Sequence, residues 1–225
     1  MNEDCWYKKV CNQECTSNCI RYLEMKYLMD NSNIPKSRQT PISLFCEDID
    51  YEAYCLLADV KNTVESFVNT GRSLYITSEY TGNGKTSWAI KILLKYFDSI
   101  WAGNGFRVRG VFVHVPTFLT KLKQFDSKDE SFEQLKQNLL TADLVVWDDI
   151  AANGMSAYDH TQLLTYIDQR ALENKSNIFT GNLHKNQLEK AIGTRLASRV
   201  WNASTVVELF GKDRRCEHDT ITDIK

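Results

Sequence analysis

The chain has 225 residues, of which 43% are hydrophobic and 25% are charged, and its formal net charge is −2. This balance is typical of a soluble globular protein with one sizeable domain and a small appendage, and it excludes an overall basic surface for nucleic acid. No apolar run approaches the roughly 20 residues that a membrane span requires, and the polar N-terminus is unlike a signal peptide. We therefore expect a cytoplasmic protein with no membrane partner.

Hydrophobic periodicity predicts that helices and strands alternate after residue 71. Before that point, a helix over 19–30 is followed by a break at Pro35 and Pro41, and residues 51–69 have apolar side chains at helical spacing. Strands that alternate with helices imply an α/β fold with a parallel sheet covered on both faces. The later elements are expected at 73–78 (strand), 85–100 (helix), 108–116 (strand), 118–125 (helix), 143–150 (strand), 158–174 (helix), 176–182 (strand), 186–202 (helix) and 204–211 (strand).

The segment TGNGKTS, residues 81–87, follows a predicted strand and opens a predicted helix. Its glycines allow the backbone to bend around an anion, and the helix start adds unsatisfied N–H groups and a positive dipole end. Lys85 is placed to reach the outer phosphates of a nucleotide, and the Thr86 hydroxyl is placed to bind Mg²⁺. A turn that only caps the helix is the simpler alternative. The predicted nucleotide-binding residues of this loop are Thr81, Gly82, Asn83, Gly84, Lys85, Thr86 and Ser87.

Glu79 departs from the P-loop pattern G-x-x-x-x-G-K-[ST], because it stands where the pattern has its first glycine. That glycine serves the turn out of the strand, whereas the later ones contact phosphate. A carboxylate that points outward would leave the site intact. One that points inward would repel a triphosphate and weaken binding.

Carboxylates and an amide end two other predicted strands. LVVW is followed by Asp148, expected to bind Mg²⁺ mostly through water, and by Asp149, expected to polarise the attacking water. The Asn182 amide ends the next strand, where it can bond the γ-phosphate or the lytic water. Arg195 and Arg199 share one helix face, and such an arginine completes the neighbour's site in oligomeric ATPases. Solvent-facing aspartates, a turn asparagine and a solvated basic face are the simpler alternatives.

Four of the seven cysteines lie within the first twenty residues, with the spacing C-x5-C-x3-C-x3-C. In a reducing compartment such cysteines bind metal or remain thiols more often than they form disulfides. Four thiolates suit tetrahedral Zn²⁺, which would fold a segment too small to have its own core. An iron–sulfur cluster and free thiols are the alternatives. The candidate metal ligands are Cys5, Cys11, Cys15 and Cys19.

The motifs GNGKTS, LVVWDDI, IFTGN, GTRLASRV and VELFGKDRR, in this order and spacing, resemble the DnaC/DnaI helicase loaders. These are AAA+ ATPases, with the transposition regulator IstB as a relative. The resemblance covers residues 74–215 and implies an AAA+ P-loop core without a C-terminal lid domain. It implies these roles: Lys85 and Thr86 bind nucleotide, Asp148 and Asp149 form Walker B, Asn182 is sensor 1, Arg199 is the arginine finger and Arg195 is a second arginine of that helix.

The resemblance also implies three regions. Residues 1–35 would be an N-terminal cysteine module that binds the helicase, 36–70 a linker and helix into the core, and 71–225 the AAA+ core. DnaI-type loaders have an N-terminal zinc module, which favours zinc. The short N-terminal region suits the compact loaders often carried by bacteriophages, which would act in the host cytoplasm.

The implied function is an ATP-binding protein that loads a replicative hexameric helicase onto single-stranded DNA during replication initiation. It would use ATP/ADP and Mg²⁺, hydrolyse ATP slowly with stimulation by DNA or its partner, and self-associate through the arginine finger. Lys121, Lys123 and Phe125 are weak candidates for DNA contact. Two other functions fit the same residues: a nucleotide-regulated IstB-like partner of a transposase, and an inhibitor that captures the replicative helicase.

Overall fold

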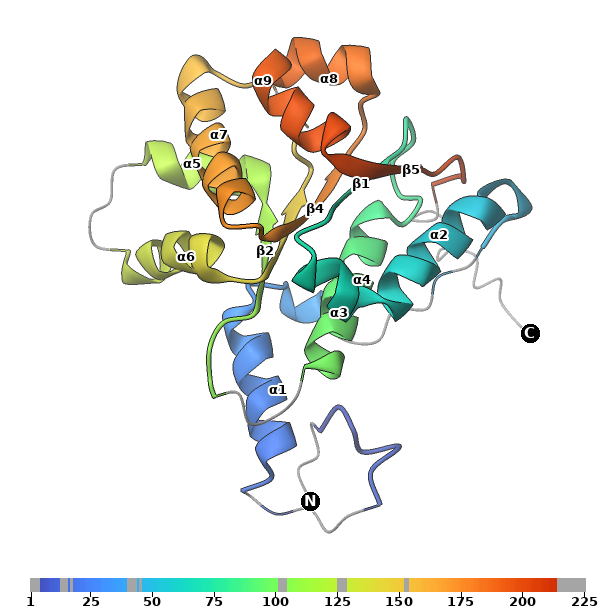
Figure 1. Cartoon of the computed structure of the whole chain (residues 1–225), viewed down its shortest axis with the longest axis vertical. Helices are drawn as coiled ribbons and strands as arrows, with labels where there is room; N and C mark the ends of the chain where they lie inside the picture. Colours follow the sequence, from blue (N-terminus) through green and yellow to red (C-terminus); the bar gives the residue numbers. More distant parts are fainter. Residues whose placement is uncertain are drawn as a thin grey trace, which may run out of the picture.

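The centre of the molecule is a parallel sheet of five strands in the order β2-β3-β4-β1-β5 (Figure 1). All carboxyl ends meet at one edge, which is where open α/β sheets bind ligands. The strands are Ser73–Thr77 (β1), Gly110–His114 (β2), Leu144–Asp148 (β3), Ser176–Gly181 (β4) and Ser204–Glu208 (β5). The computed structural model describes residues 5–12, 16, 18–39, 44, 46–100, 105–124, 129–151 and 154–213.

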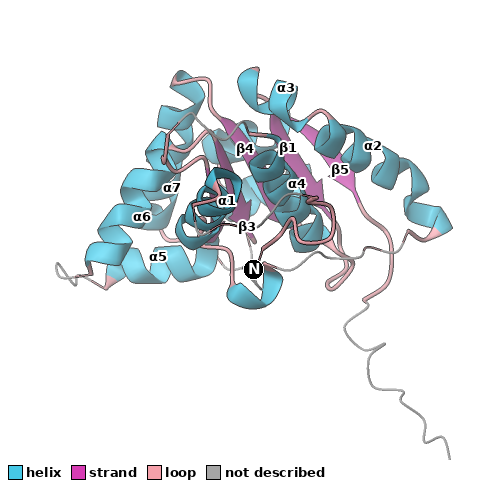
Figure 2. Ribbon diagram, turned by 90° about the horizontal axis from the view of Figure 1, so that it is seen from below, coloured by secondary structure: helices cyan, strands magenta, loops and turns pink. Residues whose placement is uncertain are grey.

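Helices cover both faces of the sheet (Figure 2). One cluster of buried apolar side chains joins helices α1 to α4 to one face, and a second joins α5 to α9 to the other. No helix in the described part of the chain is long and apolar enough to cross a membrane. The helices are Ile20–Asn31 (α1), Tyr51–Asn62 (α2), Val64–Asn69 (α3), Lys85–Ser99 (α4), Val115–Lys123 (α5), Glu130–Thr141 (α6), Ala157–Leu172 (α7), Lys185–Ile192 (α8) and Thr194–Ala197 (α9).

Alternation along the strands explains why both faces of the sheet are apolar. In β1, Leu74 and Ile76 belong to the cluster under α1 to α4, whereas Tyr75 belongs to the cluster under α5 to α9. In β3, Val146 belongs to the cluster under α1 to α4, and Trp147 belongs to the cluster under α5 to α9. Parallel strands buried on both faces read as continuous apolar runs, as these do. The predicted α/β fold with a covered parallel sheet is confirmed.

Hydrogen bonds join the residues ahead of β1 to the core. Just after α1, Ser32 O accepts from Phe112 N at 2.7 Å and Asn33 Nδ2 donates to Phe112 O at 2.8 Å, so this segment covers the β2 edge of the sheet. The carboxylate of the buried Asp50 accepts from the backbone N–H groups of Phe210 (2.6 Å) and Gly211 (3.0 Å). The segment before α2 is therefore fastened to the segment that follows β5.

Two helices that the sequence predicts as continuous are interrupted. The predicted helix 51–69 divides into α2 and α3 at Thr63, whose φ of −108° and ψ of 25° leave the helical region. The predicted helix 186–202 breaks at Gly193, where φ is 74°. Glycine adopts a backbone conformation with positive φ at little cost, so α8 ends there. The short α9 and a π-helical turn, Ser198–Asn202, follow.

Two helix starts also differ from the prediction. Helix α6 was not predicted, although Asp129 caps it by accepting from Phe132 N at 3.1 Å and the spacing of Phe132, Leu135 and Leu139 is helical. Helix α5 begins at Val115, directly after β2, because a proline in the first turn of a helix loses no hydrogen bond. The predicted strand 108–116 is correspondingly shorter.

Candidate functional site

The loop between β1 and α4 is held in shape by its own side chains. Ser78 Oγ accepts from Tyr80 N at 3.0 Å and from the amide of Asn83, which is fully buried. Gly82 and Gly84 have φ values of 70° and 101°, which disfavour any residue with a side chain. Helix α4 starts at the next residue, so its first N–H groups and the positive end of its dipole face the loop. This local structure suits an anion.

Lys85 places a positive charge over this loop. Its side chain is buried, and Nζ donates to Tyr80 O at 2.6 Å and to Asn83 Oδ1 at 3.2 Å. Both acceptors belong to the loop, so the ammonium group lies across its curve. An ammonium at this position can attract phosphate oxygens that enter the loop.

Two acidic side chains border the loop. The Asp213 carboxylate accepts from Thr81 Oγ1 at 3.0 Å and lies so close to Gly82 that an added Cβ would overlap Asp213 Oδ1. Glu79, the residue that replaces the first glycine, has a side chain 62% exposed, and its Oε1 lies 3.4 Å from His184 Nε2. The carboxylate of Glu79 is therefore engaged by a histidine on the outside of the loop.

Asp148, the last residue of β3, is a buried carboxylate next to the loop. Its Oδ1 accepts from the Thr180 hydroxyl of the neighbouring strand β4 at 2.8 Å. Burial raises the pKa of Asp148, while hydrogen bonding from Thr180 and from Thr86 acts to lower it. Because Thr86 is the second residue of α4, the structure brings the predicted Mg²⁺ ligands from two distant segments face to face.

Asp149 turns away from β3 in a left-handed conformation, with φ at 56°. Its backbone N–H donates to Thr180 Oγ1 at 3.0 Å, so one hydroxyl holds both aspartates. Its Oδ2 lies 3.6 Å from His114 Nε2. In the described part of the chain, His114, Asp148 and Asp149 form a group of possible metal ligands whose atoms lie within 4.8 Å of one another.

Asn182 follows β4 at the same edge of the sheet. Its Oδ1 is buried and has no hydrogen-bond partner among the described residues. A buried polar atom without a partner is uncommon in folded proteins and is often satisfied by water or ligand. The position is compatible with the predicted contact to a phosphate or a water molecule.

The predicted arginines do not approach the loop of their own chain. Arg195 Nη2 and Arg199 Nε bind the two carboxylate oxygens of Asp168 on α7, at 3.1 and 2.7 Å. Their side chains are 75% and 47% exposed, respectively. Figure 1 shows α9 packed beside α7 and α8, away from the start of α4.

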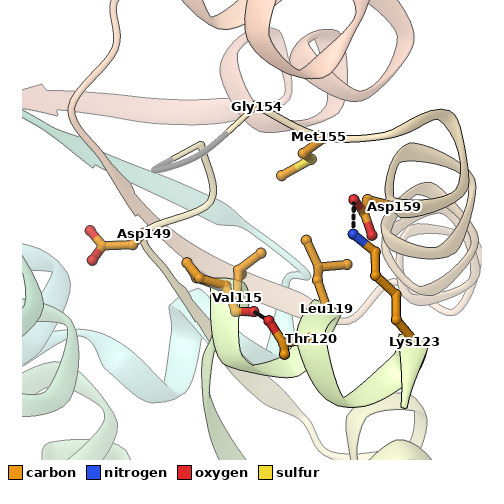
Figure 3. Close-up of a pocket in the computed structure, with 9 residues that line it drawn as sticks. Val115, Leu119, Thr120, Lys123, Asp149, Gly154, Met155 and Asp159 are labelled. Atoms are coloured by element: carbon orange, nitrogen blue, oxygen red, sulfur yellow. Dashed lines mark hydrogen bonds and ion pairs between the residues drawn. The ribbon is translucent and has the colours of Figure 1, made fainter. Parts of the chain in front are cut away.

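A groove of about 140 Å³ runs from Asp149 along α5 to the N-terminus of α7 (Figure 3). Lys123 and Asp159 close its far end with an ion pair of 2.7 Å. Lys121 Nζ lies 3.5 Å from a carboxylate oxygen of Asp129. Both lysines predicted to contact DNA are thus paired with aspartates, which makes them less available to DNA phosphates. Phe125 lies outside the described residues.

Three of the four N-terminal cysteines fall within the described residues. Cys5 and Cys19 are half-buried, Cys11 is exposed, and all three are free thiols. They do not gather into a group of three candidate ligands, and Cys15 lies outside the described residues. Zinc therefore stays a prediction.

Sequence reasoning did not select four polar residues that line this edge of the sheet: His114, Thr180, His184 and Asp213. His114 and Thr180 lie near the ends of predicted strands, and His184 and Asp213 follow the predicted strands 176–182 and 204–211 by two residues. That position was the available signal. Their partners, however, depend on which strands are neighbours.

Comparison with known proteins identifies the family. The model of the IstB-like ATP binding protein family matches residues 10–219. The chain belongs to this family. No curated protein sequence matches it significantly.

Solved structures with the same fold include the DnaC helicase loader, with a TM-score of 0.63 and 16% identity over 78% of this IstB-like chain and 99% of that one. DnaI aligns with a TM-score of 0.61 and 18% identity, covering 79% and 95% of the two chains. A putative primosome component from Streptococcus pyogenes serotype M3 has a TM-score of 0.62 and 22% identity over 84% and 98%. The fold is an AAA+ P-loop core. Within its described part only residues 209–213 follow β5, and no lid domain is evident there.

Proposed function

We propose that this IstB-like chain is an AAA+ ATPase that binds Mg·ATP at the carboxyl edge of its sheet. The proposal rests on the side chains of Lys85, Thr86 and Asp148, which come together at this edge. Lys85 lies across an anion-suited loop, and Thr86, the next residue, faces a carboxylate from a different strand. A phosphate site bordered by a hydroxyl and a carboxylate has the oxygen ligands that Mg²⁺ prefers.

Each site residue then has a distinct task. Lys85 and the loop N–H groups bind the phosphates, and Asp148 and Thr86 would hold Mg²⁺, which would supply positive charge against the negative charge that develops there. Asp149 lies beyond Asp148 and is available to polarise the attacking water, while the unpartnered amide oxygen of Asn182 can orient that water. The remaining loop residues, Thr81, Gly82, Asn83, Gly84 and Ser87, shape the phosphate cradle.

Nucleotide binding and steady-state hydrolysis of three variants test this assignment. Lys85→Ala is expected to weaken ATP binding at least tenfold, because it removes the cation of the loop. Asp149→Asn is expected to keep ATP affinity and lose hydrolysis. Lys190→Ala, which removes an exposed lysine of α8, is the control and should leave both unchanged. If the wild-type chain bound no nucleotide, or Lys85→Ala bound it normally, the site would be wrongly assigned.

The exposed arginines support self-association. Arg199, with Arg195 beside it, is proposed to reach the γ-phosphate bound by a neighbouring chain, since neither reaches the loop of its own. Arg199→Ala should then bind ATP normally and hydrolyse it poorly. Mixing Arg199→Ala with Lys85→Ala chains should restore some hydrolysis, because a mixed pair contains one complete site. No recovery in the mixture would argue against an arginine supplied in trans.

Loading of a replicative hexameric helicase onto single-stranded DNA is the proposed biological role. The observation in its favour is the shared fold with the DnaC helicase loader and DnaI. The test is ATP-dependent complex formation with the cognate helicase, followed by helicase-dependent unwinding of a DNA fork. If no complex formed in any nucleotide state, helicase loading would be excluded while ATP binding could stand.

The family match itself favours a second candidate, a nucleotide-regulated partner of a transposase. A transposase gene beside the gene for this chain, and ATP-dependent binding to that transposase, would support it. A third outcome is also informative. If the chain captured a helicase but hydrolysed ATP no faster than Asp149→Asn, it would act as an inhibitor rather than a loader.

The N-terminal region is proposed to bind the helicase and to hold zinc through Cys5, Cys11, Cys15 and Cys19. Metal analysis of protein purified without chelator should find one zinc per chain, and the visible absorption spectrum would reveal an iron–sulfur cluster instead. Single-stranded DNA is proposed to stimulate hydrolysis. A comparison of ATPase rates with and without a short oligonucleotide tests this.

A further inference from the structure

The residue that replaces the first P-loop glycine belongs to an ion-pair cluster at the ends of three adjacent strands. His184 Nε2 lies 3.4 Å from Glu79 Oε1 and 3.2 Å from Glu208 Oε1. Glu79 follows β1, His184 follows β4 and Glu208 ends β5, and β1 lies between β4 and β5 in the sheet. The cluster therefore forms only because these strands are neighbours.

The loop backbone does not depend on a glycine at this position. Among the described residues, positive φ outside glycine occurs only at Asn33, Asp149 and Asn174, so Glu79 has an ordinary backbone conformation. The turn is made by Ser78, whose Oγ accepts from Tyr80 N at 3.0 Å. What Glu79 adds is a negative charge beside the phosphate loop.

His184 is held where it can offset that charge. Its backbone N–H donates to Gln187 Oε1 at 3.1 Å, which fixes it at the start of α8. The positive end of the α8 dipole lies at the same point and favours nearby carboxylates. The titratable groups that face His184 are Glu79 and Glu208, and both are within ion-pair distance of the same nitrogen. The His184 ring also accepts from the Gln187 backbone N–H in a capping box, so Nε2 is the nitrogen that carries a proton toward the two carboxylates.

We infer that His184 is a positioning residue that keeps Glu79 out of the phosphate cradle, so that ATP affinity in this chain depends on the His184 side chain. The inference rests on the proposed nucleotide site. When the His184 ring is absent, Glu79 is released to swing toward Lys85, where it competes with the phosphates for the same cation. The Glu79 carboxylate then becomes the group that weakens ATP binding.

The test is a double-mutant cycle read by the affinity of a fluorescent ATP analogue, with Mg²⁺ present. His184→Gln is expected to weaken binding about three- to tenfold, as expected for one partly exposed charge near another. Glu79→Gln should bind at least as tightly as the wild type, and the pair of changes together should restore the affinity lost in His184→Gln. Glu173→Gln, the same charge change at the end of α7, far from the carboxyl edge, is the control and should have no effect.

The double variant separates this role from a structural one, because a structural loss would persist after the change of Glu79. Normal binding by His184→Gln, or a loss that persists in the double variant, would overturn the inference. A wild-type chain without measurable affinity would instead refute the nucleotide site, and this inference with it.

Discussion

Replacement of Arg170 is expected to lower the free energy of unfolding strongly, because its guanidinium is fully buried at the N-terminal edge of the sheet. It donates to Asn177 Oδ1 (2.8 Å) and to the backbone oxygens of Leu139 (2.7 Å), Ala142 (2.8 Å) and Ser176 (2.6 Å). It thus joins the end of α6, α7 and the start of β4. Arg170→Met would keep most of the apolar bulk and remove every donor.

The magnitude follows from the acceptors left behind. Asn177 Oδ1 retains the Trp147 indole N–H at 3.0 Å. Asp143 O, 3.5 Å from Arg170 Nη2, retains the Ser176 N–H at 3.1 Å, so three backbone carbonyls lose the donor that Arg170 supplied. At roughly 1 to 3 kcal/mol for each, reduced by the gain from no longer burying a charge, the expected loss in the free energy of unfolding is about 3 to 5 kcal/mol. For a chain of this size that lowers the melting temperature by roughly 10 °C.

Urea unfolding monitored by circular dichroism measures this loss. Arg107→Met is the matched control, because that guanidinium binds Asp143 through two nitrogens at 3.1 and 3.0 Å but its side chain is half exposed. The control should lose no more than about 1 kcal/mol. If Arg170→Met lost no more than the control, the buried network would not carry the stability assigned to it.

Three further predictions concern the site and its supports. Thr180→Val removes the hydroxyl that holds Asp148, so the rate of ATP hydrolysis should fall more than the affinity for ATP. The free energy of unfolding, measured with urea, should fall by about 1 kcal/mol. Equal losses in hydrolysis and affinity would contradict this role. Gly82→Ala introduces a Cβ where Asp213 approaches and φ is 70°, so ATP binding should be lost while the sheet stays folded by circular dichroism; normal binding would show that the loop rearranges freely. Burial acts to raise the pKa of Asp159, but hydrogen bonds from a lysine and from the helix cap outweigh it, so the pKa is lowered. The Asp159 carboxylate therefore stabilises the folded state at neutral pH, and this stabilisation is lost as pH falls through the lowered pKa. Asp159→Asn should therefore be about 1 to 2 kcal/mol less stable at neutral pH, with a gap that closes in acid; a constant gap would contradict the assignment.

The parts of the site that sequence predicted are those encoded by neighbours in the chain. The loop around Lys85 could be recognised because its glycines, its lysine and the helix start are consecutive. Asp148 and Asp149 could be recognised because an apolar strand ends at them. In both cases the chemistry depends on a short segment with a known local structure.

The parts that sequence missed depend on strand order. Thr180 reads as an ordinary strand threonine, and it becomes the support of two aspartates only because β4 is placed beside β3. His184 engages Glu79 only because β4 also lies beside β1. The break at Gly193 was missed for a different reason: periodicity continues on both sides of it, and a single glycine does not reveal its φ.

The left-handed conformation of Asp149 constrains which carboxylic acid can stand at the end of β3. Aspartate and asparagine enter this region of backbone space more readily than longer side chains, because their short polar groups can bond locally. A glutamate at this position would lack that short local bond, and its backbone would be strained. The backbone therefore selects the shorter acid, and the same strain makes Asp149→Gly a substitution that should abolish hydrolysis while making the protein harder to unfold. At this residue, the proposed catalytic role and the stability of the fold would oppose each other.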